Sequence, residues 1–213
     1  MLPLVEEEPA EAALILGEHL PLARRFAADL AHYGDELGLI GPLERARLWS
    51  RHVLNCALVA PLVTTGSRVA DVGSGAGLPG LVMALARPDV RFTLIEPMER
   101  RTNWLRDEVS RLSLTNVDVL RARAEDAEDA GPFDYVTARA VSALAKLIPL
   151  TAPLARGGGE LLFLKGTRIM DEITAAAAVI HRHRVSNIEV RELGAGVVPE
   201  VTRLFRATVG GAS

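Results

Sequence analysis

The chain has 213 residues, of which 49% are hydrophobic, enough to bury the core of one α/β domain with an added element. Its formal net charge of −3 does not by itself indicate a nucleic-acid-binding protein, so the placement of the basic residues matters more. The single cysteine, Cys56, excludes an internal disulfide and favours a reducing, cytoplasmic setting. No apolar run reaches the ~18 residues of a membrane span, and the acidic residues 1–11 predict no secretory signal.

The first part of the chain, residues 1–65, is predicted to be helical. It is too small to fold alone, so we expect an N-terminal helical extension packed on a larger domain. Pro42 suits the start of a helix whose apolar residues run from Leu48 to Ala60. On this helix His52 has two possible roles: it contacts substrate or cofactor at the mouth of a site, or it packs at the edge of the core.

Residues 66–213 alternate strand and helix patterns, which predicts a parallel sheet with helices on both faces. The predicted strands are Arg68–Val72, Arg91–Glu96, Val117–Leu120, Phe133–Ala138 and Glu160–Lys165. The predicted helices are Leu78–Ala86, Glu99–Leu112, Ser142–Leu150 and Thr167–His183. Two further strands, Ile188–Leu193 and Val201–Val209, are expected to close the sheet as an antiparallel pair.

A glycine-rich turn follows the first of these strands, with four glycines between Gly73 and Gly80. Strand, glycine turn and helix form the usual cradle for a nucleotide cofactor at the carboxyl end of a parallel strand. From Gly75 the turn fits the dinucleotide pattern G-x-G-x-x-G. From Asp71 it reads acidic-x-G-x-G-x-G, which resembles the first motif of S-adenosylmethionine (SAM)-dependent methyltransferases. A plain turn with packing glycines is the third interpretation.

Two residues of this turn favour SAM over a dinucleotide. Pro79, near the first helical position, has no N–H to offer a pyrophosphate. The Asp71 carboxylate suits a cofactor that carries an ammonium and a sulfonium. Gly77 and Leu78 belong to the same predicted cradle.

Acidic residues after the second and third strands extend the cradle. Glu96 ends the second strand about 20 residues past the glycines, where such folds place a carboxylate on ribose hydroxyls. Ala124 and Glu125 follow the third strand, where an acid can accept from an adenine amino group. A solvated acid at the strand end is the alternative for Glu96.

The fourth and fifth strands end in basic residues, Arg139 and Lys165, which we predict to be catalytic. The sequence Thr137–Val141 lacks the Asp/Asn-Pro-Pro-aromatic motif of exocyclic amine methylation, and no cysteine nucleophile lies nearby. Guanine N7 needs neither, because its lone pair carries no proton. For Arg139 we favour contact with a cofactor carboxylate or a phosphate over an ion pair with Glu125 or Asp134. For Lys165 we weigh an RNA phosphate against solvent.

Six motifs together resemble the RsmG family of 16S ribosomal RNA guanine-N7 methyltransferases, formerly glucose-inhibited division protein B. They are Arg51-His52-Val53-Leu54-Asn55, Asp71–Gly80, Arg101–Leu105, Arg123-Ala124-Glu125, Ala138-Arg139-Ala140 and Leu164-Lys165-Gly166. The resemblance covers essentially the whole chain. The chain departs from many members at Asn55-Cys56 and at Ala138, so roles for those side chains do not transfer.

The resemblance implies a Rossmann-like class I SAM-dependent methyltransferase fold, with a seven-stranded, mostly parallel sheet. Its implied substrate is a guanine of 16S rRNA in the decoding-centre region, in the small subunit or an assembly intermediate. We expect a monomer without metal. The residues predicted to bind SAM are Asp71, Gly73, Gly75, Gly77, Leu78, Glu96, Ala124, Glu125 and Arg139. Those predicted to contact RNA are Arg51, His52, Arg101, Arg123 and Lys165.

Two other functions stay open on the sequence alone: a NAD-dependent oxidoreductase, and a cofactor-binding regulatory protein without catalysis.

Overall fold

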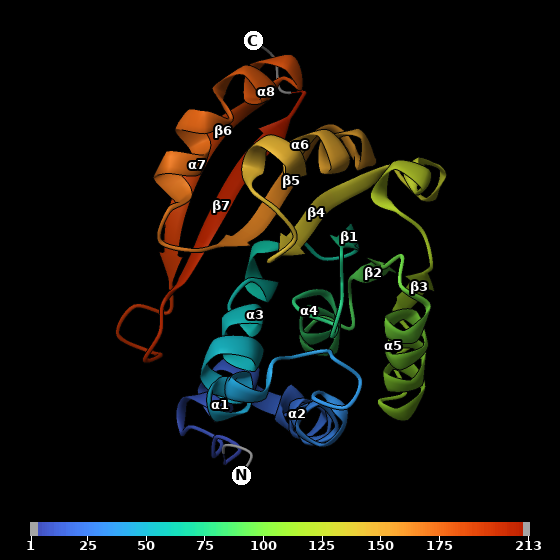
Figure 1. The fold of residues 1–213 in the computed structure, drawn as a ribbon, viewed down its shortest axis with the longest axis vertical. Coiled ribbons are helices and arrows are strands. Elements are labelled where there is room, and N and C mark those ends of the chain that lie inside the picture. Colours follow the sequence, from blue (N-terminus) through green and yellow to red (C-terminus); the bar gives the residue numbers. More distant parts are fainter. Residues whose placement is uncertain (1–3, 211–213) are drawn as a thin grey trace.

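The computed structural model describes residues 4–210, in which seven strands form one sheet in the order β3-β2-β1-β4-β5-β7-β6 (Figure 1). The strands are β1 Arg68–Val72, β2 Arg91–Ile95, β3 Val117–Leu120, β4 Phe133–Arg139, β5 Ala155–Lys165, β6 Val185–Leu193 and β7 Thr202–Val209. Strands β1 to β5 pair in parallel, and β7 runs antiparallel to both β5 and β6. The predicted fold class is confirmed.

The register aligns the carboxyl ends of the parallel strands. Val72 of β1 pairs with Ile95 of β2 on one side and with Ala138 of β4 on the other. Ile95 in turn pairs with Leu120 of β3. The loops after these strands therefore leave one edge of the sheet side by side. The chain order reverses between β1 and β4, which is where open α/β sheets bind ligands.

Helices cover both faces of the sheet. Helices α4 (Gly80–Ala86) and α5 (Glu99–Arg111) share one buried core with the N-terminal segment. Helices α6 (Leu144–Thr151), α7 (Ile169–Ala175) and α8 (Ala177–Arg182) share the other. Alternate residues of β1 divide between the cores: Val69 contributes to the first, and Ala70 and Val72 to the second.

Several predicted elements differ from the structure, most clearly the last helix and the fifth strand of the sheet domain. The predicted helix Thr167–His183 is broken into α7 and α8 at Ala176, whose backbone leaves the helical region and whose side chain is fully buried. A small residue at the break lets both short helices lie close to the sheet. Strand β5 begins at Ala155 instead of Glu160, because Ala155 pairs with Phe133 before a shift in register.

The N-terminal segment is helical and packs on the sheet domain, but its helices are irregular. Helices α1 (Glu11–Leu16), η1 (Gly17–His19) and α2 (Leu20–Tyr33) come first. The helix predicted from Pro42 forms as a 3₁₀ segment, η2 (Pro42–Arg47), a π-helix, η3 (Leu48–Leu54), a short α3 (Asn55–Ala57) and a 3₁₀ turn, η4 (Ala60–Leu62). The Glu6 carboxylate accepts from the backbone N–H groups of Trp49 (2.8 Å) and Ser50 (3.0 Å), near the start of η3.

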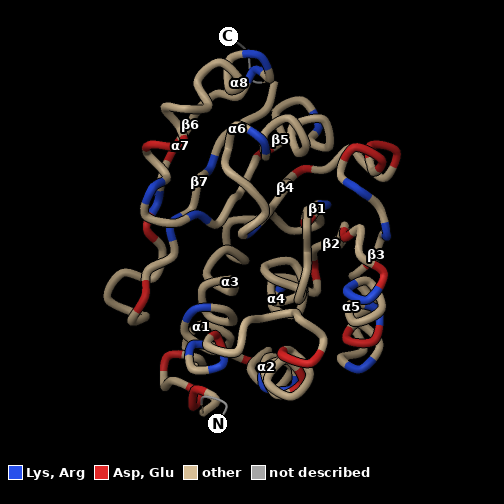
Figure 2. The backbone as a smooth tube through the Cα atoms, in the orientation of Figure 1, with Lys and Arg blue, Asp and Glu red and all other residues tan. Residues whose placement is uncertain are grey.

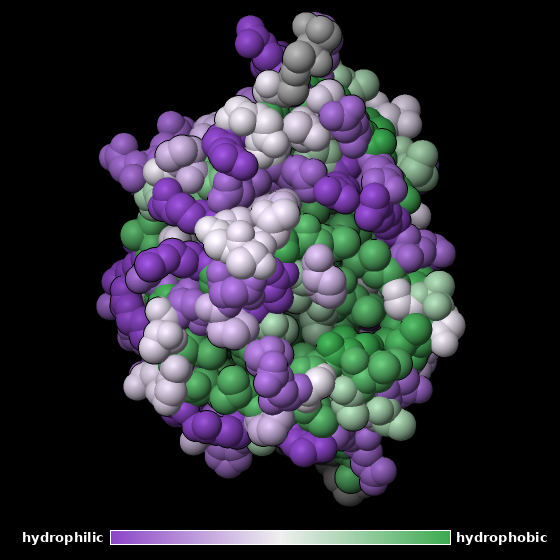
Figure 3. Space-filling view, turned by 180° about the vertical axis from the view of Figure 1, so that it is seen from behind, coloured by the Kyte–Doolittle hydropathy of each residue, from purple (hydrophilic) through white to green (hydrophobic). Residues whose placement is uncertain are grey.

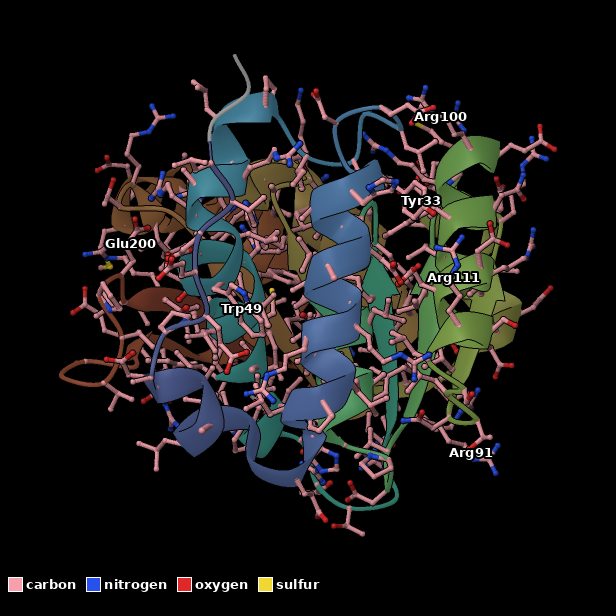
Figure 4. All side chains as sticks on the ribbon, turned by 90° about the horizontal axis from the view of Figure 1, so that it is seen from below. Tyr33, Trp49, Arg91, Arg100, Arg111 and Glu200 are labelled. Carbon is pink, nitrogen blue, oxygen red and sulfur yellow. The ribbon has the colours of Figure 1, made fainter. Side chains whose placement is uncertain are left out.

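Helices α2 and α5 meet through polar and aromatic side chains. Tyr33 and Arg111 lie between the two helices in Figure 4, with the Arg111 guanidinium carbon 5.2 Å from the centre of the Tyr33 ring. Arg25 of α2 donates to the backbone oxygen of Arg111. The extension is thus attached to the sheet domain through α5 as well as through the shared core.

Charged and apolar residues are interspersed on the surface. Basic and acidic residues alternate along α5 (Figure 2). Seen from behind, hydrophilic and hydrophobic residues are mixed, with hydrophobic areas right of centre and toward the lower left (Figure 3). Within residues 4–210, none of the helices combines the length and the apolar composition of a membrane span.

Candidate active site

A cavity of about 700 Å³ lies at the carboxyl edge of the sheet. Its walls come from the loops after β1, β2, β3 and β4, from the first turn of α5, and from the N-terminal extension between residue 39 and η3. It brings together most of the residues predicted from the sequence. Those that line it are Gly73, Gly75, Leu78, Glu96, Ala124, Glu125, Arg139, Arg51, His52, Arg101 and Arg123. Asp71, Gly77 and Lys165 do not line it.

The glycine turn takes backbone conformations that side chains rarely adopt. Gly73 has φ +70°, and a Cβ there would lie 2.7 Å from a methyl carbon of Val141. Gly77 has φ +98°, and its Cβ would lie 2.9 Å from the Cβ of Leu81. Gly73 therefore permits close approach at the cavity wall. Gly77 permits the turn to pack on α4, which is not the contact that the sequence predicted.

Asp71 is fully buried behind the turn. It precedes the last residue of β1, so the alternation of the strand directs its side chain toward α4. Its Oδ2 accepts from the backbone N–H of Gly80 (3.0 Å), the first residue of α4. Burial raises the pKa of Asp71 to about 7. The predicted contact with the positive charges of a cofactor is replaced here by a contact that fixes the start of the helix.

Glu96 holds the glycine turn in place while lining the cavity. Its Oε2 accepts from the N–H of Gly75 (3.0 Å) and its Oε1 from the N–H of Met98 (2.9 Å). Each carboxylate oxygen has a second lone pair, so ribose hydroxyls can still donate to it. Trp104 of α5 adds a second support, because its Nε1 donates to the backbone oxygen of Ala76 (3.1 Å).

Arg139 is held by residues of the N-terminal extension. Its Nη2 lies 2.7 Å from Nδ1 of His52, and its Nη1 donates to Sγ of Cys56 (3.4 Å). Neither ion pair considered as an alternative from the sequence, with Glu125 or Asp134, forms in the structure. His52 is buried at the edge of the core, and it also lines the cavity, so its position is compatible with a ligand contact as well as with packing.

Lys165 is engaged inside the protein. Its Nζ lies 2.7 Å from Oε2 of Glu172 on α7 and donates to the backbone oxygen of Ser142 (2.9 Å). Its side chain is 9% exposed. This arrangement joins the end of β5 to α7 and to the loop before α6, away from the cavity wall.

The sequence prediction missed several residues of the cavity wall. Leu39, Ile40 and Glu44 come from the extension, while Met98 and Val141 follow β2 and β4. The extension residues gave no motif, because their position depends on packing against distant parts of the chain. For Met98 and Val141 the signal was position alone: each lies within three residues of a strand end that had already been assigned to the site.

Comparison with known proteins gives the family of the chain. The family model "rRNA small subunit methyltransferase G" (GidB) matches residues 19–200. The ribosomal RNA small subunit methyltransferase G of Leifsonia xyli subsp. xyli is 62% identical over 205 residues, covering 96% of this chain and 98% of that protein.

Solved structures share the fold at low sequence identity. Cofactor-bound Rv0187 from MTB has a TM-score of 0.61 at 17% identity, covering 97% of this chain and 100% of that one. M. jannaschii TYW2 in complex with AdoMet has a TM-score of 0.58 at 19% identity, covering 76% of each chain. The comparisons give no support to the oxidoreductase alternative. Because this family model matches most of the chain, the chain belongs to the rRNA small subunit methyltransferase G (GidB) family.

Proposed function

We propose that this protein transfers the methyl group of SAM to N7 of a guanine in 16S rRNA. The observation that carries the proposal is the convergence, in one cavity, of the family's glycine turn with Glu96, Ala124 and Arg139. A cavity of about 700 Å³ is in the size range of small-molecule sites.

The cavity wall fits SAM. Gly73 and Gly75 leave backbone where side chains would project, Glu96 would offer carboxylate oxygens to a ribose, and Ala124 with Glu125 would hold an adenine. When bound, the cofactor supplies an electrophilic methyl group. Arg139 retains N–H groups beyond those given to His52 and Cys56, and these would bind an anion such as the cofactor carboxylate.

The side chains around Arg139 favour a target atom that needs no deprotonation. Burial raises the pKa of the Cys56 thiol, and its sulfur already accepts from Arg139, so it is not a thiolate nucleophile. Burial and Arg139 lower the pKa of His52 to about 4, and both of its ring nitrogens are already engaged. Neither side chain is therefore suited to act as a base or nucleophile, and the protein acts by aligning a guanine ring nitrogen with the methyl group, without a general base.

The arginines at the cavity mouth are suited to RNA phosphates. Arg51, Arg101 and Arg123 line the cavity, and Arg123 is exposed. We further propose that the chain works as a cytoplasmic monomer on the small subunit or an assembly intermediate, and that residues 1–65 form an extension to the methyltransferase domain at 66–213.

Two experiments test this function. Titration calorimetry is expected to show binding of SAM and none of NAD; the reverse result would exclude the proposal. Mass mapping of 16S rRNA nucleosides from cells with and without the protein is expected to show loss of one N7-methylguanosine. Unchanged rRNA methylation with intact SAM binding would instead favour a regulatory protein.

A further inference from the structure

A chain of polar contacts leads from Arg139 to the surface of the extension. Arg139 lies 2.7 Å from Nδ1 of His52, and Nε2 of His52 lies 2.7 Å from Oε2 of Glu44. The same Glu44 oxygen forms an ion pair with Nε of Arg51 at 3.2 Å. Arg51 has a second acidic neighbour, Glu200, at 3.7 Å. The shortest contact of Glu44 is thus with the histidine.

The contacts determine where the His52 proton lies. A guanidinium has donors only, so Nδ1 of His52 must accept from Arg139. A neutral imidazole whose Nδ1 carries no hydrogen has its hydrogen on Nε2, and this N–H donates to Glu44. The lowered pKa of His52 agrees with a neutral ring, since burial and the Arg139 charge outweigh the opposite influence of Glu44. The ring is therefore neutral and in one tautomer near neutral pH.

We propose that Glu44 is a positioning residue for methyl transfer, which fixes the tautomer and orientation of His52 and thereby directs the Arg139 guanidinium at an anionic group of the ligand. This inference rests on the proposed function. The anion is the SAM carboxylate or an RNA phosphate, and binding measurements with each ligand distinguish the two.

Without Glu44 the Nε2–H group of His52 loses its protein acceptor. The ring is then free to turn or to place a hydrogen on Nδ1, where it would oppose the N–H groups of Arg139. A glutamine at position 44 keeps an oxygen acceptor but no charge, so it should preserve the tautomer. A role limited to the ion pair with Arg51 would not be rescued by glutamine.

The variants Glu44→Ala and Glu44→Gln separate these roles. Glu8→Ala is the matched control, because Glu8 forms an ion pair with Arg24 at 2.6 Å elsewhere on the extension and does not line the cavity. Long-range ¹H–¹⁵N NMR spectra report the tautomer of each imidazole, and a His52→Gln sample identifies the His52 signals. We expect wild type, Glu44→Gln and Glu8→Ala to show the Nε2–H form, and Glu44→Ala to show averaged nitrogens.

Binding provides the second readout. For Glu44→Ala we expect the Kd for SAM to rise roughly tenfold, the order expected when a charge-assisted hydrogen bond is misdirected. If the anion is a phosphate, the Kd for SAM stays unchanged and the KM for small subunits rises by about that factor instead. Glu44→Gln should recover most of either loss, and Glu8→Ala should show none.

Three results would overturn the inference. The first, which needs no variant, is a wild-type His52 in the Nδ1–H or charged form. The second is a Glu44→Ala variant with unchanged spectra and affinities, and the third is an equal loss of ligand affinity in Glu44→Ala and Glu44→Gln. Failure of the proposed function is distinguishable, since wild-type protein would then bind no SAM whatever the tautomer of His52.

Discussion

Replacing Glu108 by glutamine is expected to stabilise the folded protein above neutral pH. Glu108 lies on α5 with a side chain that is 0% exposed. Its Oε1 accepts from Nη1 of Arg111 (2.8 Å), while Oε2 has no partner among the described residues. Burial, assisted by the nearby charge of Asp29, raises the pKa of Glu108 to about 7 in spite of Arg111.

The sign and size of the effect follow from this pKa. The folded state holds the proton up to about pH 7, whereas the unfolded chain releases it near its ordinary value of 4.5. The resulting stability is complete below the unfolded pKa and is lost as the pH rises through the folded one. Over roughly 2.5 pH units this amounts to about 3 kcal/mol. Since glutamine also gives up the attraction of Arg111, we expect a net gain of about 1–2 kcal/mol near pH 8.

Urea unfolding followed by tryptophan fluorescence measures this gain, because Trp104 lies on the same helix. The free energies of unfolding of Glu108→Gln and wild type should converge near pH 5 and separate near pH 8. Glu18→Gln, at a side chain that is 90% exposed, is the control and should leave the pH dependence unchanged. A difference between Glu108→Gln and wild type that is the same at both pH values would refute the reasoning.

Three further changes address the site. Glu96→Gln should raise the Kd for SAM about tenfold in calorimetry, since one of the two backbone N–H groups bound by Glu96, those of Gly75 and Met98, loses its acceptor; wild-type affinity would show that these two contacts do not position the ligand. Gly73→Ala should abolish SAM binding in a protein that still folds, because its φ is +70° and its Cβ meets Val141; retained binding would show that the turn adapts. Arg123→Ala should reduce the salt slope of RNA binding by about one unit, and Arg91→Ala, at the amino end of β2 and outside the cavity wall (Figure 4), should not; a slope in Arg123→Ala equal to that of wild type would remove Arg123 from the interface.

Much of the site could be predicted from the sequence because strand order and local pattern encode it. Alternating strands and helices imply a parallel sheet, and a parallel sheet brings the residues after successive strands to one edge. Glu96, Ala124 and Arg139 follow three different strands, and the structure places all three on the wall of one cavity. The glycines of the turn and the family motifs then identified the type of ligand.

What the sequence alone determined is therefore which strand ends meet, together with the family of the chain. Only the tertiary structure decided the direction of individual side chains: Asp71 toward α4, Lys165 toward Glu172, and Arg139 onto His52. It also decided that Glu44 of the extension reaches the site. Local periodicity is a short-range property, whereas these contacts join residues far apart in the chain, whose packing and burial exist only once the fold has formed.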